Sequence, residues 1–218
     1  MIHRMAVIDL PSARGAALSG RPARGGLRDA RGFTMLEVLV ALVITVFGLL
    51  GLIGVQAVAH QAELESYQRA QALIMLNDIV ERINANRGSA TCYAITSAAT
   101  GTPYLGTTTG GGYAGTPSCT FGYVNIQTKA LADSGMAEWD QILQGAAEAA
   151  GGGGNVGAMA GARGCVSFDP VANVYTVAVA WQGMTDTFAP VVNCANGLYG
   201  PETKRRVVWT TLQIAKLS

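Results

Sequence analysis

The chain has 218 residues, enough for one domain of ordinary size or two small ones. Its net charge of +1 is divided unevenly, because residues 1–32 hold six arginines and two aspartates, or +4, and the remainder therefore carries −3. A remainder of that charge excludes a basic nucleic-acid binder by composition, and we expect no nucleic acid among its partners.

Residues 1–31 are rich in arginine, glycine, alanine and proline and have no apolar period. This composition predicts a disordered basic leader that is absent from the mature product. An internal translation start at Met5 stays an open alternative. Because basic segments tend to stay in the cytoplasm, the leader predicts that the C-terminal part lies across a membrane from it.

An apolar run from Val38 to Ala59 follows without any charged residue. It is long enough to cross a bilayer, which takes about 20 helical residues. Glu37 stands at the start of this run, where a charged side chain costs about 3 kcal/mol near the bilayer centre, so an acid there indicates a function. If the chain were cut between Gly32 and Phe33, the new amino group would lie one helical turn from Glu37 and could pair with it.

The junction Arg31-Gly32, followed by Phe-Thr-Met-Leu-Glu-Val and the apolar run, resembles the class III leader of type IV pilins and of secretion pseudopilins. The resemblance implies that a prepilin peptidase cuts after Gly32 and that Phe33 becomes an N-methylated terminus. It also implies that Glu37 neutralises the amino terminus of a neighbouring subunit. The expected partners are other major and minor pilins, the prepilin peptidase, the inner-membrane assembly platform and, before assembly, membrane lipid.

Two other interpretations of this segment are an ordinary membrane anchor and a secretory signal peptide. An ordinary single-span anchor accounts for the run but not for Glu37 or the Gly32-Phe33 junction. A secretory signal peptide has a small-x-small site available at 57–59, but its apolar region is about 7–15 residues long, shorter than this run.

Beyond His60 the pattern becomes amphipathic and predicts that one helix continues from Phe33 to Asn86, about 80 Å in all. Its buried stripe is expected to contain Ala72, Leu73, Leu76, Ile79, Val80 and Ile83. Asp78 and Arg82 are expected to pair on the opposite side. The first half would face lipid or other subunits, and the second half would pack under a globular head.

Four cysteines, Cys92, Cys119, Cys165 and Cys194, lie beyond the apolar run and include no C-x-x-C pair. An even number in this position favours disulfides in an oxidising compartment, although four free thiols remain the alternative. Of the three possible connectivities we favour the sequential one, Cys92–Cys119 and Cys165–Cys194, because each pair brackets a loop-rich segment.

The head has a mixed pattern. Residues 88–122 predict a long loop, and residues 133–150 predict a helix that is capped by Asp133 or Ser134 and buries Met136, Trp139, Ile142 and Leu143. Glycines 151–154 would break that helix and form a linker.

From Arg163 the apolar period changes to two and predicts three antiparallel strands, the last from Arg206 to Ile214. The inward face of the middle strand would carry Tyr175, Val177, Val179 and Trp181. The predicted fold class is therefore α+β and pilin-like, with the sheet over the second half of the long helix. Residues 164–166, 175–183 and 205–208 also resemble the C-terminal part of the PilV family of minor pilins.

Catalytic chemistry has few candidate residues in the head. No histidine follows His60, which removes histidine-based triads and metal sites, so we expect no enzyme, no cofactor and no metal. Asp133, Glu138 and Asp140 are expected to be caps and solvated acids. The basic segment 204–206 is expected to be a solvated strand entry.

These patterns predict a minor type IV pilin that helps to prime pilus assembly and enters the filament. Residues 1–32 would be the cleaved leader, 33–60 the membrane and polymerisation half of the helix, and 61–218 the head. The protein would be anchored in the inner membrane with its head in the periplasm and would later reach a surface pilus. A type II secretion pseudopilin and a membrane-anchored periplasmic binding module are the alternatives.

Overall fold

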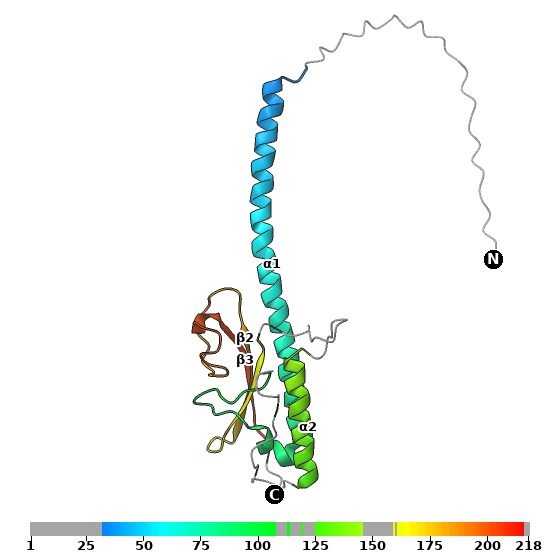
Figure 1. Ribbon diagram of the computed structural model, residues 1–218, viewed down its shortest axis with the longest axis vertical. Coiled ribbons are helices and arrows are strands. Elements are labelled where there is room, and N and C mark those ends of the chain that lie inside the picture. The colour runs from blue at the N-terminus through cyan, green and yellow to red at the C-terminus, as the bar shows by residue number, and fades with distance from the viewer. Residues whose placement is uncertain are drawn as a thin grey trace, which may run out of the picture. The chain divides into compact units, whose positions relative to one another are not determined.

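The computed structural model describes residues 32–107, 113, 119, 125–145, 159 and 161–215. The chain forms two compact units, residues 1–49 and 50–218 (Figure 1). The described part of the first unit is a short non-helical segment and the start of helix α1, which runs from Met35 to Ala85. The second unit holds the rest of α1 and the remaining elements.

Within the second unit, α1 buries one stripe of apolar side chains: Ala72, Met75, Leu76, Ile79 and Ile83. Spacings of three and four residues place them on one helical face, and four of the five were predicted. Leu73 was wrongly placed in the stripe, since its side chain is 45% exposed and Met75 takes part instead. One residue corresponds to about 100° of helical rotation, so position 73 already turns away from Ala72.

The 3₁₀ helix η1, Arg87–Tyr93, follows α1 directly and occupies the start of the segment 88–122, which was predicted to be a loop. Beyond it the described residues to 107 form no regular strand, as predicted for a loop, but Leu105 makes an isolated antiparallel bridge with Gly164. Thr96 N also donates to Val166 O at 2.9 Å. Glycines 110–112 lie outside the described residues.

Helix α2 spans Ile126–Leu143 and begins earlier than predicted. Asn125 and Thr128 form its capping box: Thr128 N donates to Asn125 Oδ1 at 2.8 Å, and Asn125 N donates to Thr128 Oγ1 at 3.0 Å. The predicted cap Asp133 instead lies inside the helix and pairs with Lys129 at 2.7 Å. Of the predicted buried residues, Met136, Trp139 and Leu143 are buried and Ile142 partly so.

The end of α2 also differs from the prediction. The helix stops at Leu143, and Gly145 follows with φ +86°, a left-handed conformation that glycine adopts without strain and that often terminates helices. The predicted stop at glycines 151–154 lies outside the described residues.

Three antiparallel strands form one sheet in the order β1-β2-β3: β1 Arg163–Asp169, β2 Val174–Gln182 and β3 Arg205–Leu212. The turn between β1 and β2 uses Asn173 at φ +54°. The last strand is two residues shorter than predicted at its C-terminal end.

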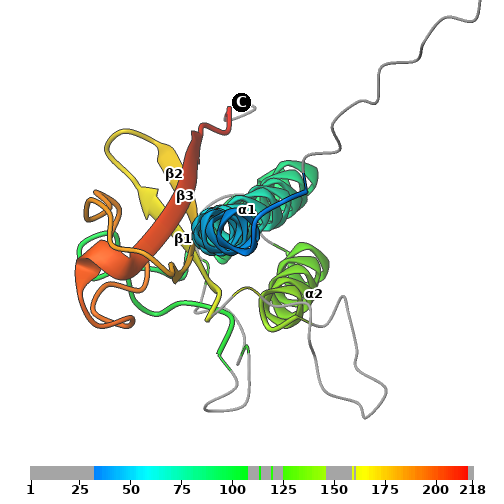
Figure 2. The same ribbon diagram turned by 90° about the horizontal axis from the view of Figure 1, so that it is seen from above.

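Alternation along the strands gives the sheet two faces. The inner face carries Tyr175, Val177, Val179 and Trp181, which are buried as predicted in one cluster with the α1 stripe. Figure 2 shows α1 between the sheet on one side and α2 on the other. The α+β pilin-like class is thereby confirmed.

The core joins α2 to both neighbours through Trp139. Its indole Nε1 donates to Met75 O of α1 at 2.9 Å, and its side chain is fully buried. Gly164 on β1 makes room for the ring, because a Cβ there would lie 2.4 Å from Trp139 Cη2.

Candidate functional site

The residues on either side of the predicted cut lie just before α1. Gly32, Phe33 and Thr34 are non-helical, and the side chain of Phe33 is 82% exposed. Thr34 caps the helix, since Glu37 N donates to Thr34 Oγ1 at 3.2 Å and to Thr34 O at 3.0 Å. An N-cap of this kind satisfies one of the backbone donors that a helix start leaves unpaired.

Glu37 is the third residue of α1, and its side chain makes no hydrogen bond or ion pair with any other described residue. The start of α2 is different, because there the side chains of Asn125 and Thr128 both bond back to the backbone. The spacing Thr34-x-x-Glu37 would permit the same reciprocal box. The carboxylate of Glu37 thus stays available for a partner outside these residues.

Thr34 was missed as a functional residue by the sequence reasoning, although the signal was present. Ser or Thr followed three residues later by Glu, just before an apolar run, is a recognised mark of a helix start.

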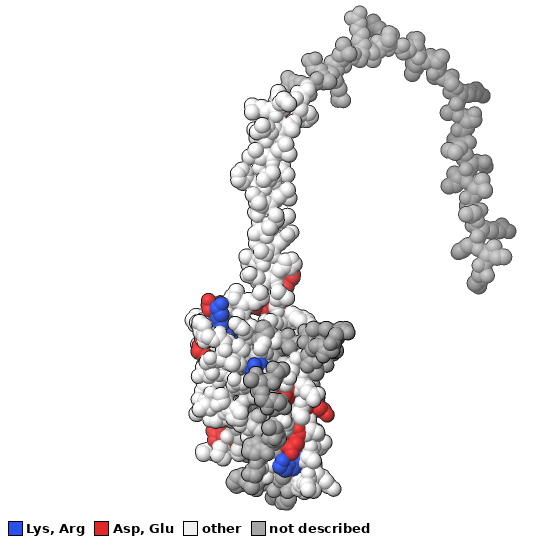
Figure 3. All heavy atoms as spheres, viewed as in Figure 1, with Lys and Arg blue, Asp and Glu red and all other residues white. Residues whose placement is uncertain are grey.

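The apolar half of α1 is exposed along its length. Met35, Leu36, Phe47 and Val55 are all at least 68% exposed, as is Phe33 just before the helix. Among the described residues, α1 is the one helix long and apolar enough to cross a membrane. The residues of its most apolar stretch are not buried against any other part of the described chain. A signal sequence near an N-terminus passes the same test, but a helix buried in a soluble core does not fit this exposure. In Figure 3 the charged side chains visible on this face gather on the second unit.

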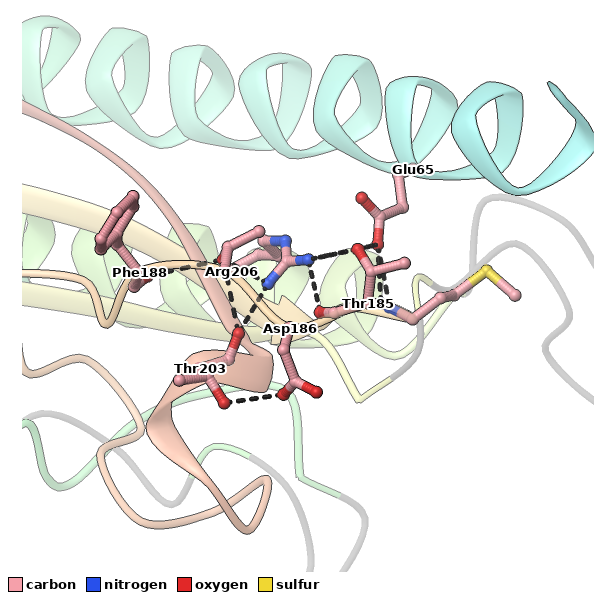
Figure 4. A network of polar contacts seen from close by, with 8 residues as sticks. Glu65, Thr185, Asp186, Phe188, Thr203 and Arg206 are labelled. Atoms are coloured by element: carbon pink, nitrogen blue, oxygen red, sulfur yellow. Dashed lines mark hydrogen bonds and ion pairs between the residues drawn. The ribbon is translucent and has the colours of Figure 1, made fainter. Parts of the chain in front are cut away.

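Within the second unit, the sequence reasoning also missed a polar network between α1 and the segment after β2 (Figure 4). Glu65 Oε1 accepts from Met184 N at 3.1 Å, from Thr185 N at 3.0 Å and from Thr185 Oγ1 at 2.9 Å. It also pairs with Arg206 Nη2 of β3 at 3.2 Å. Burial alone would raise the pKa of Glu65, but the Thr185 hydrogen bonds and the Arg206 charge outweigh it and lower that pKa.

The basic segment at the entry to β3 was predicted to be solvated, and this was wrong for two of its three residues. The side chain of Arg205 is 2% exposed and that of Arg206 is 14% exposed. Arg205 pairs with Glu202 at 2.6 Å and donates to Val192 O at 2.6 Å and to Cys194 O at 3.0 Å. It therefore holds the long connection between β2 and β3 in place, a role that depends on contacts distant in sequence.

Both disulfides in the structure follow the sequential connectivity. Cys92 is joined to Cys119 with Cα atoms 4.9 Å apart, and Cys165 is joined to Cys194 with Cα atoms 5.8 Å apart. The first bridge joins η1 to Cys119, which lies between η1 and α2 in the sequence. The second ties the β2–β3 connection to β1, on the outer face of the sheet.

The acids of α2 all have structural partners. Asp133 pairs with Lys129, and Glu138 pairs with Arg82 of α1 at 2.6 Å. Asp140 was expected to be solvated but is only 3% exposed. Its carboxylate accepts hydrogen bonds from Gly106 N at 2.6 Å and from Tyr113 N at 3.2 Å. Within the described residues, no cluster of three or more histidines, cysteines, aspartates or glutamates has metal-binding geometry.

Comparisons with known families bear on the N-terminal and central parts of the chain. A family model described as the prokaryotic N-terminal methylation motif matches residues 27–53, which contain Gly32, Phe33 and Glu37. A second, described as type IV pilin Tt1218, matches residues 54–122. No curated protein and no solved structure matches the chain. The two adjoining matches, the exposed apolar helix and the α+β head agree with one another and support a type IV pilin.

Proposed function

We propose that the chain is a minor type IV pilin, a non-catalytic filament subunit that helps to prime pilus assembly. The single observation that carries the proposal is the arrangement at the start of α1. A helix with an exposed apolar surface begins two residues after Phe33, and its third residue, Glu37, has no partner for its carboxylate among the described residues.

Processing comes first in the proposed sequence of events. A prepilin peptidase removes residues 1–32 by cutting the Gly32–Phe33 bond, and the new terminus becomes N-methylphenylalanine. The match to an N-terminal methylation motif over residues 27–53 supports this step. The non-helical backbone of Gly32 and Phe33 supports it as well, since proteolytic cuts concentrate in segments outside regular structure.

Membrane residence follows. The apolar half, residues 33–60, spans the inner membrane, and the head, residues 61–218, lies in the periplasm. Two disulfides in the head support that location, because such bridges persist in oxidising compartments.

Assembly uses the charge of Glu37. Its carboxylate is unfavourable among apolar neighbours unless a cation meets it, and the amino group exposed at Phe33 is the cation that processing supplies. In the membrane the pair forms within one chain. In the filament the amino terminus belongs to an adjacent pilin, so the pair fixes the axial register of the two subunits as well as the charge balance.

N-terminal and intact-mass analysis of the mature protein tests the processing step. The expected product begins at Phe33 and carries one methyl group on its nitrogen. A product that begins at His60 would show that the apolar run is a signal peptide and would overturn the proposal.

Sheared surface filaments test the role itself. The mature protein should be found in them together with other pilins. Recovery only from the membrane fraction would favour a membrane-anchored binding module. If deletion of the gene abolishes protein secretion and leaves the pili intact, a pseudopilin of a type II secretion system is favoured.

A further inference from the structure

Among the described residues, Arg69 of α1 has no partner, although an acid lies at a spacing that would permit an ion pair. Glu65 precedes it by four residues, an arrangement in which helical acids and bases usually pair. Glu65 instead bonds to Arg206 and to Met184 and Thr185, as Figure 4 shows for the arginine and the threonine. Arg69 makes no hydrogen bond or ion pair with any residue in the described part of the chain.

Arg69 lines a cavity of about 350 Å³ between α1 and the sheet. Glu65, Ser66 and Arg69 of α1, Trp181 of β2, and Arg206, Val207 and Val208 of β3 form its walls. Two arginines and one glutamate leave the lining with one positive charge in excess. The cavity therefore combines a cationic rim with the apolar surface of Trp181 and Val208, which both lie on the inner face of the sheet.

A carboxylate on a short aliphatic stem matches this lining. The guanidinium of Arg69 presents a planar set of donors that fits both oxygens of a carboxylate. Methylene groups of the stem would contact Trp181 and Val208, whereas a small inorganic anion would leave that apolar surface unused. The net positive charge of the cavity lining attracts an acidic side chain and disfavours a basic one.

We propose that this cavity receives an aspartate or glutamate side chain from a neighbouring pilin subunit, with Arg69 as its ion-pair partner. The inference rests on the proposed function, since it requires a filament neighbour. Leu64 and Tyr67, on the same stretch of α1, are 52% and 56% exposed and continue the apolar surface through which subunits would pack. Beyond residue 32 the chain carries −3, so even a second copy has acids to offer.

Charge reversal at Arg69 is the test. Full-length protein carrying Arg69→Glu, Arg69→Lys or the control Arg87→Glu would be expressed in the native host, and its amount in sheared filaments compared with that in membranes. We expect Arg69→Glu to lower incorporation by about tenfold and Arg69→Lys by about twofold, because lysine keeps the charge but loses the planar fork. Arg87→Glu should match the wild type, because Arg87 bonds only to Asn84 O among the described residues.

Normal incorporation of Arg69→Glu, beside depletion of a Glu37→Ala variant, would overturn this inference and leave the proposed function standing. Absence of the wild-type protein from filaments would overturn both. If Arg69→Glu incorporates normally but no longer binds phosphatidylglycerol vesicles, the occupant is a lipid headgroup and the proposal is wrong. Selection for restored assembly of Arg69→Glu should return acid-to-base changes in a co-assembled pilin.

Discussion

Glu65 and Arg206 lie 141 residues apart in the sequence, yet the carboxylate and the guanidinium are 3.2 Å apart in the folded head. The side chain of Glu65 is 26% exposed and that of Arg206 is 14% exposed, so water screens the pair only in part. Arg206 also donates to Thr185 O at 2.7 Å and to Thr203 O at 3.0 Å. The Glu65–Arg206 pair thus links α1 to β3 and to both ends of the β2–β3 connection.

Glu65→Gln should reduce stability in a pH-dependent way. Hydrogen bonds to charged groups contribute about 1.5–3 kcal/mol each, and glutamine keeps part of this network, so we expect a loss of about 1–2 kcal/mol in the free energy of unfolding at pH 7. The folded state lowers the pKa of Glu65 below its ordinary 4.5. The stabilisation by the charge is therefore complete above that value and disappears as the pH falls through the lower, folded pKa.

Urea unfolding of the mature protein in detergent, at pH 7 and at pH 3, measures this effect. The difference between wild type and Glu65→Gln should narrow at the lower pH. Glu63→Gln is the control, since Glu63 contacts only the exposed His60 among the described residues and should change stability by less than about 0.5 kcal/mol. An equal difference at both pH values would mean that the charge of Glu65 contributes nothing.

Removal of the Cys165–Cys194 disulfide should destabilise the head. The bridge closes a segment with a sequence separation of 29, and closing a loop of that size stabilises by about 3–4 kcal/mol through the unfolded chain. Replacing both cysteines by serine should lower the urea midpoint accordingly. The matched Cys92→Ser, Cys119→Ser variant removes a bridge of separation 27 and should cost a similar amount.

Non-reducing peptide mapping of the wild-type protein would establish the pairing that this prediction assumes. Free thiols in material from the periplasmic side would contradict it. An unchanged urea midpoint in the double variants would show that the bridges do not limit the unfolded chain.

Gly164→Ala should be destabilising although alanine is otherwise a mild replacement. The added Cβ would lie 2.4 Å from Trp139 and 2.6 Å from the Cδ1 of Leu143, both buried in the core. Overpacking of this kind costs about 1–3 kcal/mol. Thermal unfolding of the mature protein checks it, with Gly54→Ala as the control, because nothing lies within 4 Å of a Cβ there. Equal melting temperatures for the two variants would show that the Trp139 ring shifts at little cost.

Glu37→Ala should leave cleavage after Gly32, membrane insertion and the head intact but lower incorporation into filaments. An unpaired buried charge costs about 3–5 kcal/mol, so loss of the partner of the amino terminus should reduce co-assembly by at least about tenfold. Glu37→Asp should be intermediate, because it keeps the charge and shortens its reach. Quantitative blotting of filament and membrane fractions gives the ratio. If Glu37→Ala enters filaments at the normal level, Glu37 has no recruiting role. It is then only a helix-start acid that interacts favourably with the helix dipole.

Local patterns in the sequence determined the long helix, its apolar half and the alternating faces of the strands. Helical and strand periods are properties of neighbouring residues, so Ile79, Ile83, Val177 and Val179 could be assigned to the core from spacing alone. The start of α2 was assigned wrongly. Aspartate and asparagine are equally good N-cap residues, so residue type alone does not distinguish Asp133 from Asn125, and only packing selects between them.

Tertiary structure decided which charged groups meet. Glu65 has Arg69 four residues later in the sequence, yet its partner is Arg206, because folding brings β3 against α1 and adds donors from residues 184–185 that no helical neighbour can offer. The same process buries Arg205 and Asp140, whose residue types alone predict solvation. Desolvation and hydrogen bonding depend on everything that packs around a group, and that arrangement exists only after segments far apart in the sequence have come together.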